Sequence, residues 1–228
     1  MRIAGLQKTT LVDYPGKVAA TVFTLGCNFR CPYCHNPELV LPEKFLPTLE
    51  NASFFTFLEE RRGRLEAVCI TGGEPTIQPG LADFIRQIKD MGFLVKLDTN
   101  GTRPEILRQL FQRGDIDYIA MDLKAPLSKY GSLTGLTRSS IEQICASIAL
   151  IMQSGIPYEF RTTVMKPLLE VADFEAIGEL IQGTPTYYLQ NYRASKQVGT
   201  QVFTPFTDEE LKSAQAILHY YVGIVEIR

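Results

Sequence analysis

Short runs of β-forming residues alternate with helix-like segments along almost the whole chain. The expected strands are 19–25, 66–71, 93–99, 117–123, 157–164, 186–191 and an apolar terminal run at 222–227. The expected helices are 53–62, 81–91, 104–114, 139–155, 173–183 and 208–221. Ser53 is expected to cap the first helix, while Pro104 and Gly114 mark the start and the end of the third. Such alternation is typical of a parallel sheet with right-handed helical crossovers.

The number of strand–helix units limits the architecture. Six units are too few for a complete eight-stranded barrel and enough for an incomplete one, while an open doubly wound sheet remains possible. With 228 residues, 45% of them hydrophobic, the chain can bury one sizeable core. Because no repeat, low-complexity tract or linker marks a boundary, residues 1–228 are expected to form a single domain.

Charge and hydropathy exclude several classes of partner. The formal net charge of −2 gives no basic field that would favour nucleic acid or an anionic membrane. The apolar runs are too short to span a bilayer, and the N-terminus has no apolar segment typical of a signal peptide. We therefore expect a soluble, cytoplasmic protein that binds neither nucleic acid nor membrane.

Three of the five cysteines, Cys27, Cys31 and Cys34, lie in the stretch GCNFRCPYCHN. In a reducing cytosol, clustered cysteines more often bind metal or carry out redox chemistry than form disulfides. A zinc site with His35 as fourth ligand is one interpretation. It is disfavoured because adjacent residues rarely bind one metal and no distant ligand pair is visible. The other interpretation is an iron–sulfur cluster held by three thiolates, with one iron left open to a small molecule.

Further polar motifs stand where predicted strands end: TGGEP at 71–75, LDTNG at 97–101 and MDLK at 121–124. Taken singly, they could be a Gly-Gly turn, a capping Asp or Asn, and a surface ion pair. The paired glycines could also let a ligand lie against bare backbone. The carboxyl ends of parallel strands form the ligand-binding rim of barrels and of open sheets. With the cysteine loop, these motifs predict one site on that rim.

The cysteine spacing and its companions resemble the radical S-adenosylmethionine (SAM) enzymes. The resemblance implies an α/β fold, the incomplete (βα)6-type TIM barrel of that family. It also implies a [4Fe–4S] cluster on Cys27, Cys31 and Cys34, whose open iron binds the amino and carboxylate groups of SAM. One-electron reduction of such a cluster cleaves SAM and yields a 5′-deoxyadenosyl radical.

The same resemblance implies contacts to SAM. The GGE motif, which holds the methionine amino group, corresponds to Gly73 and Glu74. Other SAM contacts are implied at Asp122 and Lys124 of the DLK motif, and at Arg193, where the pyruvate formate-lyase activator has a histidine.

Two further groups complete the implied site. Tyr33 and His35 match positions that pack near the adenine. A monovalent cation beside the SAM carboxylate would involve three residues, Asp98, Thr99 and Asp122.

Three residues remain outside the implied site. Arg161 could serve it or be a buried structural arginine. Cys69 and Cys145 stand at apolar positions and are expected in the core.

The run KTTLVDYPGKVAATVFTLGCNFRCPYCHNPELV at 8–40 resembles the long-form activating proteins of anaerobic ribonucleoside-triphosphate reductase. These belong to the activating enzymes of glycyl radical proteins. The implied partners are therefore a glycyl radical enzyme, anaerobic ribonucleoside-triphosphate reductase first, and a flavodoxin- or ferredoxin-type electron donor. Three alternatives stay open: an activator of the pyruvate formate-lyase type, a radical SAM enzyme acting on a small molecule, as 7-carboxy-7-deazaguanine synthase does, and a non-catalytic metal-binding protein.

Overall fold

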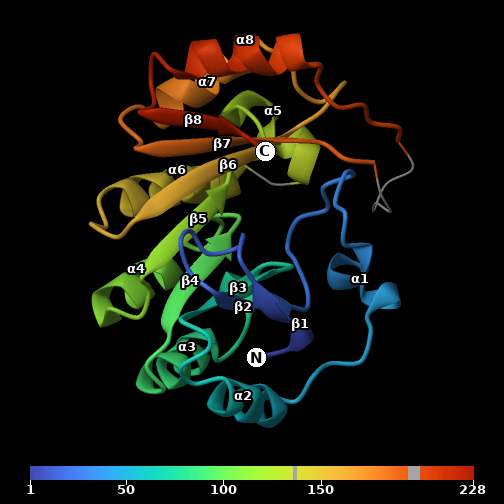
Figure 1. The fold of residues 1–228 in the computed structure, drawn as a ribbon. Helices are drawn as coiled ribbons and strands as arrows, with labels where there is room; N and C mark the ends of the chain where they lie inside the picture. Colours follow the sequence, from blue (N-terminus) through green and yellow to red (C-terminus); the bar gives the residue numbers. More distant parts are fainter. Residues whose placement is uncertain (136–137, 195–200) are drawn as a thin grey trace. The chain divides into compact units, whose positions relative to one another are not determined.

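The computed structural model describes residues 1–135, 138–194 and 201–228 (Figure 1). The strands in these ranges are β1 (Ile3–Thr10), β2 (Ala19–Thr24), β3 (Ala67–Gly72), β4 (Leu94–Thr99), β5 (Tyr118–Asp122), β6 (Tyr158–Val164), β7 (Thr186–Asn191) and β8 (Ile224–Ile227). The α-helices are α1 (Pro37–Val40), α2 (Asn51–Glu60), α3 (Leu81–Asp90), α4 (Pro104–Arg113), α5 (Leu127–Thr134), α6 (Arg138–Met152), α7 (Asp173–Leu180) and α8 (Asp208–Leu218). Two short 3-10 helices are η1 (Pro42–Lys44) and η2 (Pro75–Ile77).

The strands follow one another through the sheet in chain order, from β1 to β8. β1 pairs with β2 antiparallel, while β2 with β3, β3 with β4, β6 with β7, and β7 with β8 pair in parallel. Successive βα crossovers place consecutive parallel strands side by side in this way. The predicted α/β class with a mostly parallel sheet is confirmed.

The described chain forms two compact units. The first comprises Met1–Asn28, Asn36–Thr99 and Arg103–Ile119, and the second comprises Phe29–His35, Asn100–Thr102 and Ala120–Arg228. The cysteine loop and the LDTNG segment therefore each contribute to both units. The single domain expected from the sequence stays a prediction.

In the first unit, helices α2 and α3 cover strands whose apolar residues are buried on both faces. Ala67 to Ile70 of β3 are fully buried, as in a strand of a parallel sheet covered on both sides. Helix α3 buries one face through Leu81, Phe84, Ile85 and Ile88. The Phe84 ring stacks on Phe54 of α2 with the centroids 5.1 Å apart, and this contact joins the two helices.

In the second unit, α7 and α8 pack together beside β7 and β8 (Figure 1). The start of α8 is fixed by a capping box. The Thr207 hydroxyl accepts a hydrogen bond from the Glu210 backbone N–H (3.2 Å), and the Glu210 carboxylate accepts one from the Thr207 N–H (2.8 Å). These bonds satisfy N–H groups at the helix start that would otherwise lack partners.

Several local expectations differ from the structure. Ser53 does not cap α2, because the helix already begins at Asn51 and Glu50 stands at its N-cap. Strand β1 and helix α5 were not expected from their sequences. Cys69 is buried as predicted, whereas Cys145 is only half-buried on α6. Helix α4 begins at Pro104 and ends before Gly114, whose positive φ supplies the left-handed cap, as predicted.

Across the described ranges, the helices lack the combination of length and apolar character that crossing a membrane requires.

Candidate functional site

The turn after β3 packs directly against the start of the cysteine loop. The backbone N–H of Gly73 donates to the Thr24 carbonyl (2.9 Å), and that of Glu74 donates to the Gly26 carbonyl (2.8 Å). A Cβ on Gly73 would overlap the Gly26 carbonyl. Gly73 is therefore needed for the close approach of two backbones, and its contact with SAM stays a prediction. This contact positions the chain immediately before Cys27.

Glu74 joins the end of β3 to the end of β4. Its carboxylate is buried and accepts hydrogen bonds from the Thr76 N–H (3.1 Å), the Thr76 hydroxyl (2.6 Å) and the Thr99 hydroxyl (2.8 Å). The structure thus brings two predicted site residues, Glu74 and Thr99, into contact. Whether Glu74 also meets the SAM amino group stays a prediction, and the observed bonds give it a positioning role.

Asp98 has a partner that the sequence analysis missed. The ammonium of Lys96 lies 2.5 Å from Asp98 Oδ1, and the Lys96 side chain is almost fully buried. The two residues are separated by one position in β4, so their side chains leave the strand on the same face. The sequence feature that could have indicated this pair is a lysine inside the apolar run FLVKLDT.

In the second unit, Cys31 and Cys34 belong to one tight turn, closed by a hydrogen bond from the Cys34 N–H to the Cys31 carbonyl (3.1 Å). Cys31 is buried, and both cysteines are free thiols. Burial raises the pKa of the Cys31 thiol, while the nearby Lys124 ammonium opposes that rise. A metal ligand must be the thiolate, so binding there would release a proton.

The MDLK motif places two fixed charges beside Cys31. Asp122 accepts a hydrogen bond from Arg161 Nε (2.8 Å) and another from Lys124 Nζ (3.2 Å). Burial would raise the pKa of Asp122, but the Arg161 and Lys124 cations outweigh it and hold that pKa far below its usual range. Likewise, burial would lower the pKa of Lys124, but the Asp122 carboxylate outweighs it and raises that pKa. Both groups are therefore charged at neutral pH.

Arg161 was left undecided by the sequence, and the structure gives it a defined role. It is the direct partner of Asp122, and its guanidinium also lies 3.8 Å from the buried carboxylate of Glu159. The backbone N–H of Lys124 donates to the Tyr130 hydroxyl (3.0 Å), which fixes the end of β5. These contacts hold the predicted SAM-binding charges in place.

Aromatic side chains surround the end of the cysteine loop in the second unit. Tyr33 packs edge-on against Phe203 at 6.2 Å, and the His35 ring lies 5.3 Å from that of Tyr192. The Tyr33 hydroxyl is buried beside the Cys31 thiol and has no nitrogen or oxygen partner among the described residues. His35 is exposed, but the part of its ring that is withdrawn from water lowers its pKa. Arg193 lies just after β7 and is exposed, and its contact with SAM stays a prediction.

The Asn100 side chain stabilises the turn in which it lies. Its side-chain oxygen accepts hydrogen bonds from the Thr102 N–H (3.1 Å) and the Thr102 hydroxyl (2.7 Å), as asparagines in turns often do. The Ser147 hydroxyl donates to the Gly101 carbonyl (2.6 Å) and ties this turn to α6.

The side chains of the cysteine loop have the chemistry that an iron–sulfur cluster and an organic ligand require. Cys27, Cys31 and Cys34 supply the thiol groups that iron–sulfur clusters use. The buried Tyr33 hydroxyl and the Asp122–Lys124 pair supply polar groups for a ligand beside them. Within the ranges that the structure describes, no three His, Cys, Asp or Glu side chains are grouped to hold a single metal ion.

Comparison with known proteins identifies the family. The family model of the Radical SAM superfamily matches residues 21–194, a range that contains the cysteine loop and all three strand-end motifs. The chain belongs to the radical SAM superfamily. It is therefore an enzyme, and the cofactors of this radical SAM protein are a [4Fe–4S] cluster and SAM.

Curated relatives of this radical SAM chain fall into more than one group. A Methanocaldococcus jannaschii protein named as a glycyl-radical enzyme activating enzyme is 32% identical over 99% of the chain and 95% of its own length. The pyruvate formate-lyase-activating enzyme of Clostridium pasteurianum is 31% identical over 54% of the chain and 52% of its length. The 7-carboxy-7-deazaguanine synthase of Thermoplasma acidophilum is 34% identical over 51% of the chain and 52% of its length. The resemblance to the activating enzymes is confirmed.

A solved structure supports the fold. SuiB from Streptococcus suis bound to S-adenosylmethionine superposes on 91% of the chain and on 51% of that protein, with a TM-score of 0.67 and 13% identity. At this identity the likeness extends to the fold alone.

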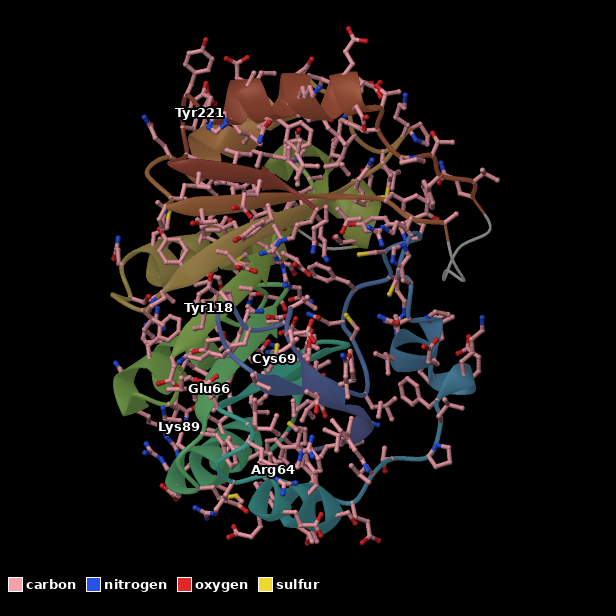
Figure 2. The ribbon with its side chains drawn as sticks, in the orientation of Figure 1. Arg64, Glu66, Cys69, Lys89, Tyr118 and Tyr221 are labelled. Atoms are coloured by element: carbon pink, nitrogen blue, oxygen red, sulfur yellow. The ribbon has the colours of Figure 1, made fainter. Side chains whose placement is uncertain are left out.

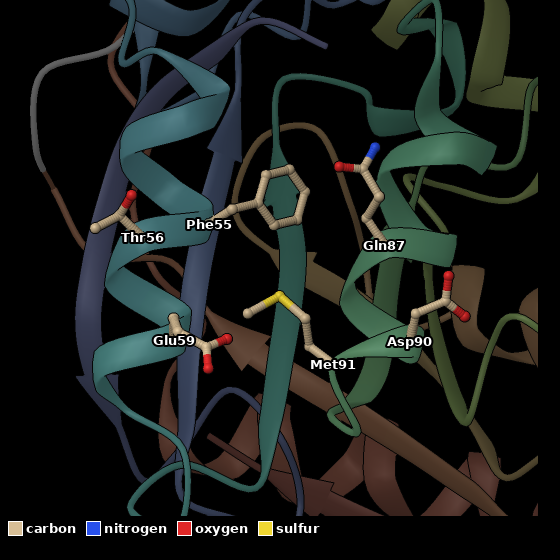
Figure 3. A pocket seen from close by; sticks show the side chains of 6 residues that line it. All are labelled: Phe55, Thr56, Glu59, Gln87, Asp90 and Met91. Carbon is tan, nitrogen blue, oxygen red and sulfur yellow. The ribbon is translucent and has the colours of Figure 1, made fainter.

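A surface groove of about 430 Å³ lies elsewhere in the first unit (Figure 3). Its lining comes from α2 and from the end of α3: Phe55, Thr56, Glu59, Gln87, Asp90 and Met91. Helix α3 leads back from the end of β3 to the start of β4, so its last turn lies near the start of that strand. The groove contains none of the predicted site residues.

Proposed function

We propose that the chain activates a glycyl radical enzyme. The observation that carries this proposal is the 32% identity to the Methanocaldococcus jannaschii activating enzyme, which extends over nearly the full length of both proteins. The sequence features that first suggested it, from the N-terminal run to MDLK, lie within that match. The pyruvate formate-lyase-activating enzyme among the shorter matches supports the same class of reaction.

In the proposed reaction, one electron cleaves SAM to methionine and a 5′-deoxyadenosyl radical, which takes a hydrogen atom from a glycine Cα and leaves 5′-deoxyadenosine and a glycyl radical. The cofactors supply this chemistry, and the protein supplies binding and orientation. Cys27, Cys31 and Cys34 hold the cluster. Asp122 and Lys124 position SAM through charges fixed before it binds.

The residues of each unit have their own proposed roles. From the first unit, Gly73 and Glu74 fix the loop that leads into Cys27. From the second, Tyr33 and His35 supply the aromatic surface proposed for the adenine. No side chain acts as an acid or base in this scheme.

We further propose anaerobic ribonucleoside-triphosphate reductase as the partner, with a flavodoxin- or ferredoxin-type protein as the electron donor. The support is the resemblance of residues 8–40 to the long-form activating proteins of that reductase. A glycyl radical enzyme of the pyruvate formate-lyase type is the alternative within the same class.

A small-molecule substrate is the second candidate function. The similarity to 7-carboxy-7-deazaguanine synthase favours it, although that match covers only about half of the chain. The two candidates differ in the source of the hydrogen atom that 5′-deoxyadenosine acquires. An activator takes it from a protein, whereas the alternative takes it from a small molecule.

An isotope experiment distinguishes them. The protein is reconstituted with iron and sulfide without oxygen, then mixed with SAM, a reductant and a reductase labelled with deuterium at its glycine Cα positions. The proposal predicts deuterium in 5′-deoxyadenosine, detected by mass spectrometry. Unlabelled product with every glycyl radical enzyme tried, together with deuterium transfer from a labelled small substrate, would contradict it.

A further inference from the structure

Lys96 is a buried lysine in the middle of a parallel strand. Its side chain is 2% exposed, and its ammonium lies 2.5 Å from Asp98 Oδ1. A buried charge of this kind loses its hydration and persists only where an opposite charge lies against it. Lys96 and Asp98 therefore form a coupled pair inside the first unit.

The surroundings hold the ammonium in place. Cys69 lies opposite Lys96 in the β3–β4 ladder, and its sulfur is 3.9 Å from the Lys96 nitrogen and 3.9 Å from Asp98. The Tyr118 ring lies 5.9 Å from the same nitrogen, within reach of a cation–π attraction. Cys69 and Tyr118 are labelled on their strands in Figure 2. The ammonium is thus fixed by its carboxylate and by an aromatic ring.

This pair bears on the monovalent cation that the resemblance implied at Asp98, Thr99 and Asp122. Asp98 has Lys96 as its counter-ion, and the Thr99 hydroxyl donates a hydrogen bond to the Glu74 carboxylate. In the second unit, Asp122 is matched by Arg161 and Lys124. Each carboxylate therefore has a basic side chain as counter-ion, and a metal cation there would meet fixed positive charge.

We infer that the Lys96 ammonium is a built-in counter-ion of Asp98 and takes the place of a bound monovalent cation. The inference rests on the SAM site of the proposed function, because only there does a cation beside Asp98 matter. It implies that the protein binds SAM equally well in sodium, potassium or choline salts. It also implies that removing the ammonium creates a site where an alkali cation restores the missing charge.

The first test uses the protein without cluster or SAM, so it does not depend on activity. Thermal unfolding is measured in sodium, potassium and choline chloride at equal ionic strength for the parent, Lys96→Met, and Lys96→Met combined with Asp98→Asn. We expect no ion-specific response in the parent or the double variant, and stabilisation of Lys96→Met by sodium or potassium over choline. Lys89→Met is the matched control, because Lys89 pairs with Asp117 elsewhere in the same unit at 2.6 Å.

The second test measures SAM binding to the reconstituted protein by calorimetry in the same salts. We expect one dissociation constant for the parent in all three. For Lys96→Met we expect a loss of about 10-fold in choline, regained in sodium or potassium. The inference is overturned if parent binding requires sodium or potassium, or if Lys96→Met gains no ion-specific response in either test. If Lys96→Met does not fold, sodium-23 relaxation is measured with the parent and with Asp98→Asn instead. Equal relaxation in the two supports the inference, and faster relaxation with the parent overturns it. Failure to bind SAM in any salt would count against the proposed function, and the cofactor-free test would still judge the inference.

Discussion

Arg161, on β6, donates from Nε to Oδ1 of Asp122, the last residue of β5, over 2.8 Å. Lys124, two residues further along the chain, places its Nζ 3.2 Å from Oδ2 of the same carboxylate. This arrangement fixes Asp122 as an anion before any ligand arrives. It also makes Arg161 the ion-pair partner of a predicted site residue.

Replacing Arg161 by Gln should change how stability depends on pH. Because the pKa of Asp122 is depressed in the folded protein, its stabilisation is complete above the unfolded value of about 4 and is lost as the pH falls below it. Without the guanidinium, the depression shrinks. The variant should be less stable by about 1–3 kcal/mol at neutral pH and should lose less on acidification.

Urea unfolding between neutral and acid pH measures this effect. Lys166→Met is the control, since Lys166 pairs with Glu210 at 2.9 Å near the surface, where an ion pair contributes little to stability. Equal losses in the two variants at every pH would show that Asp122 is not controlled by Arg161.

The cluster should depend on three cysteines and on no others. Alanine at Cys27, Cys31 or Cys34 should abolish the iron-dependent visible absorption of anaerobically reconstituted protein, because each removes a thiolate ligand. Alanine at Cys69 or Cys145 should leave it. Full iron and sulfide content in Cys34→Ala, or tight zinc binding without iron uptake in the parent, would overturn the assignment.

Gly73→Ala should damage the cluster as well as SAM binding. The added Cβ would overlap the Gly26 carbonyl and displace the backbone that leads into Cys27. Iron content and SAM affinity of the reconstituted variant should both fall. Gly5→Ala is a suitable control, since its Cβ would meet only the Phe23 side chain at an ordinary 3.7 Å. Normal iron content in Gly73→Ala would mean that the loop adapts.

Tyr33→Phe should separate stability from binding. The buried hydroxyl has no nitrogen or oxygen partner among the described residues, and sulfur, here the neighbouring Cys31 thiol, is a weak acceptor, so its removal should leave the cofactor-free protein as stable as the parent or more stable, by up to about 1 kcal/mol. SAM affinity should fall if the hydroxyl is retained for a ligand. A clear loss of stability in the cofactor-free variant would show that the hydroxyl is already satisfied in the fold.

Much of the fold and part of the site follow from the sequence for one physical reason. Apolar runs between amphipathic helices predict parallel strands, and parallel strands end on the same edge. The sequence alone therefore predicts that Cys31 lies near Asp122 and Lys124. The Glu74–Thr99 contact joins two such strand ends in the same way.

The remainder depends on packing that local sequence does not encode. Lys96 lies in an apolar run, and only tertiary structure shows that it is buried against Asp98 rather than directed to solvent. The pairing of Arg161 with Asp122 likewise requires the position of β6. Strand β1 gains its conformation from antiparallel pairing with β2, and its own residues, with Gly5 and a polar end, give a weak strand pattern.

The central claim is tested most directly by electron paramagnetic resonance. The reconstituted protein is mixed with SAM, a reductant and anaerobic ribonucleoside-triphosphate reductase, and the spectrum of the reductase is recorded. The account predicts a carbon-centred doublet that is absent when the radical-bearing glycine of the reductase is replaced by alanine. A doublet on another glycyl radical enzyme alone would correct the partner and leave the mechanism. No glycyl radical on any such enzyme, while SAM is still cleaved and a small molecule is consumed, would contradict the account.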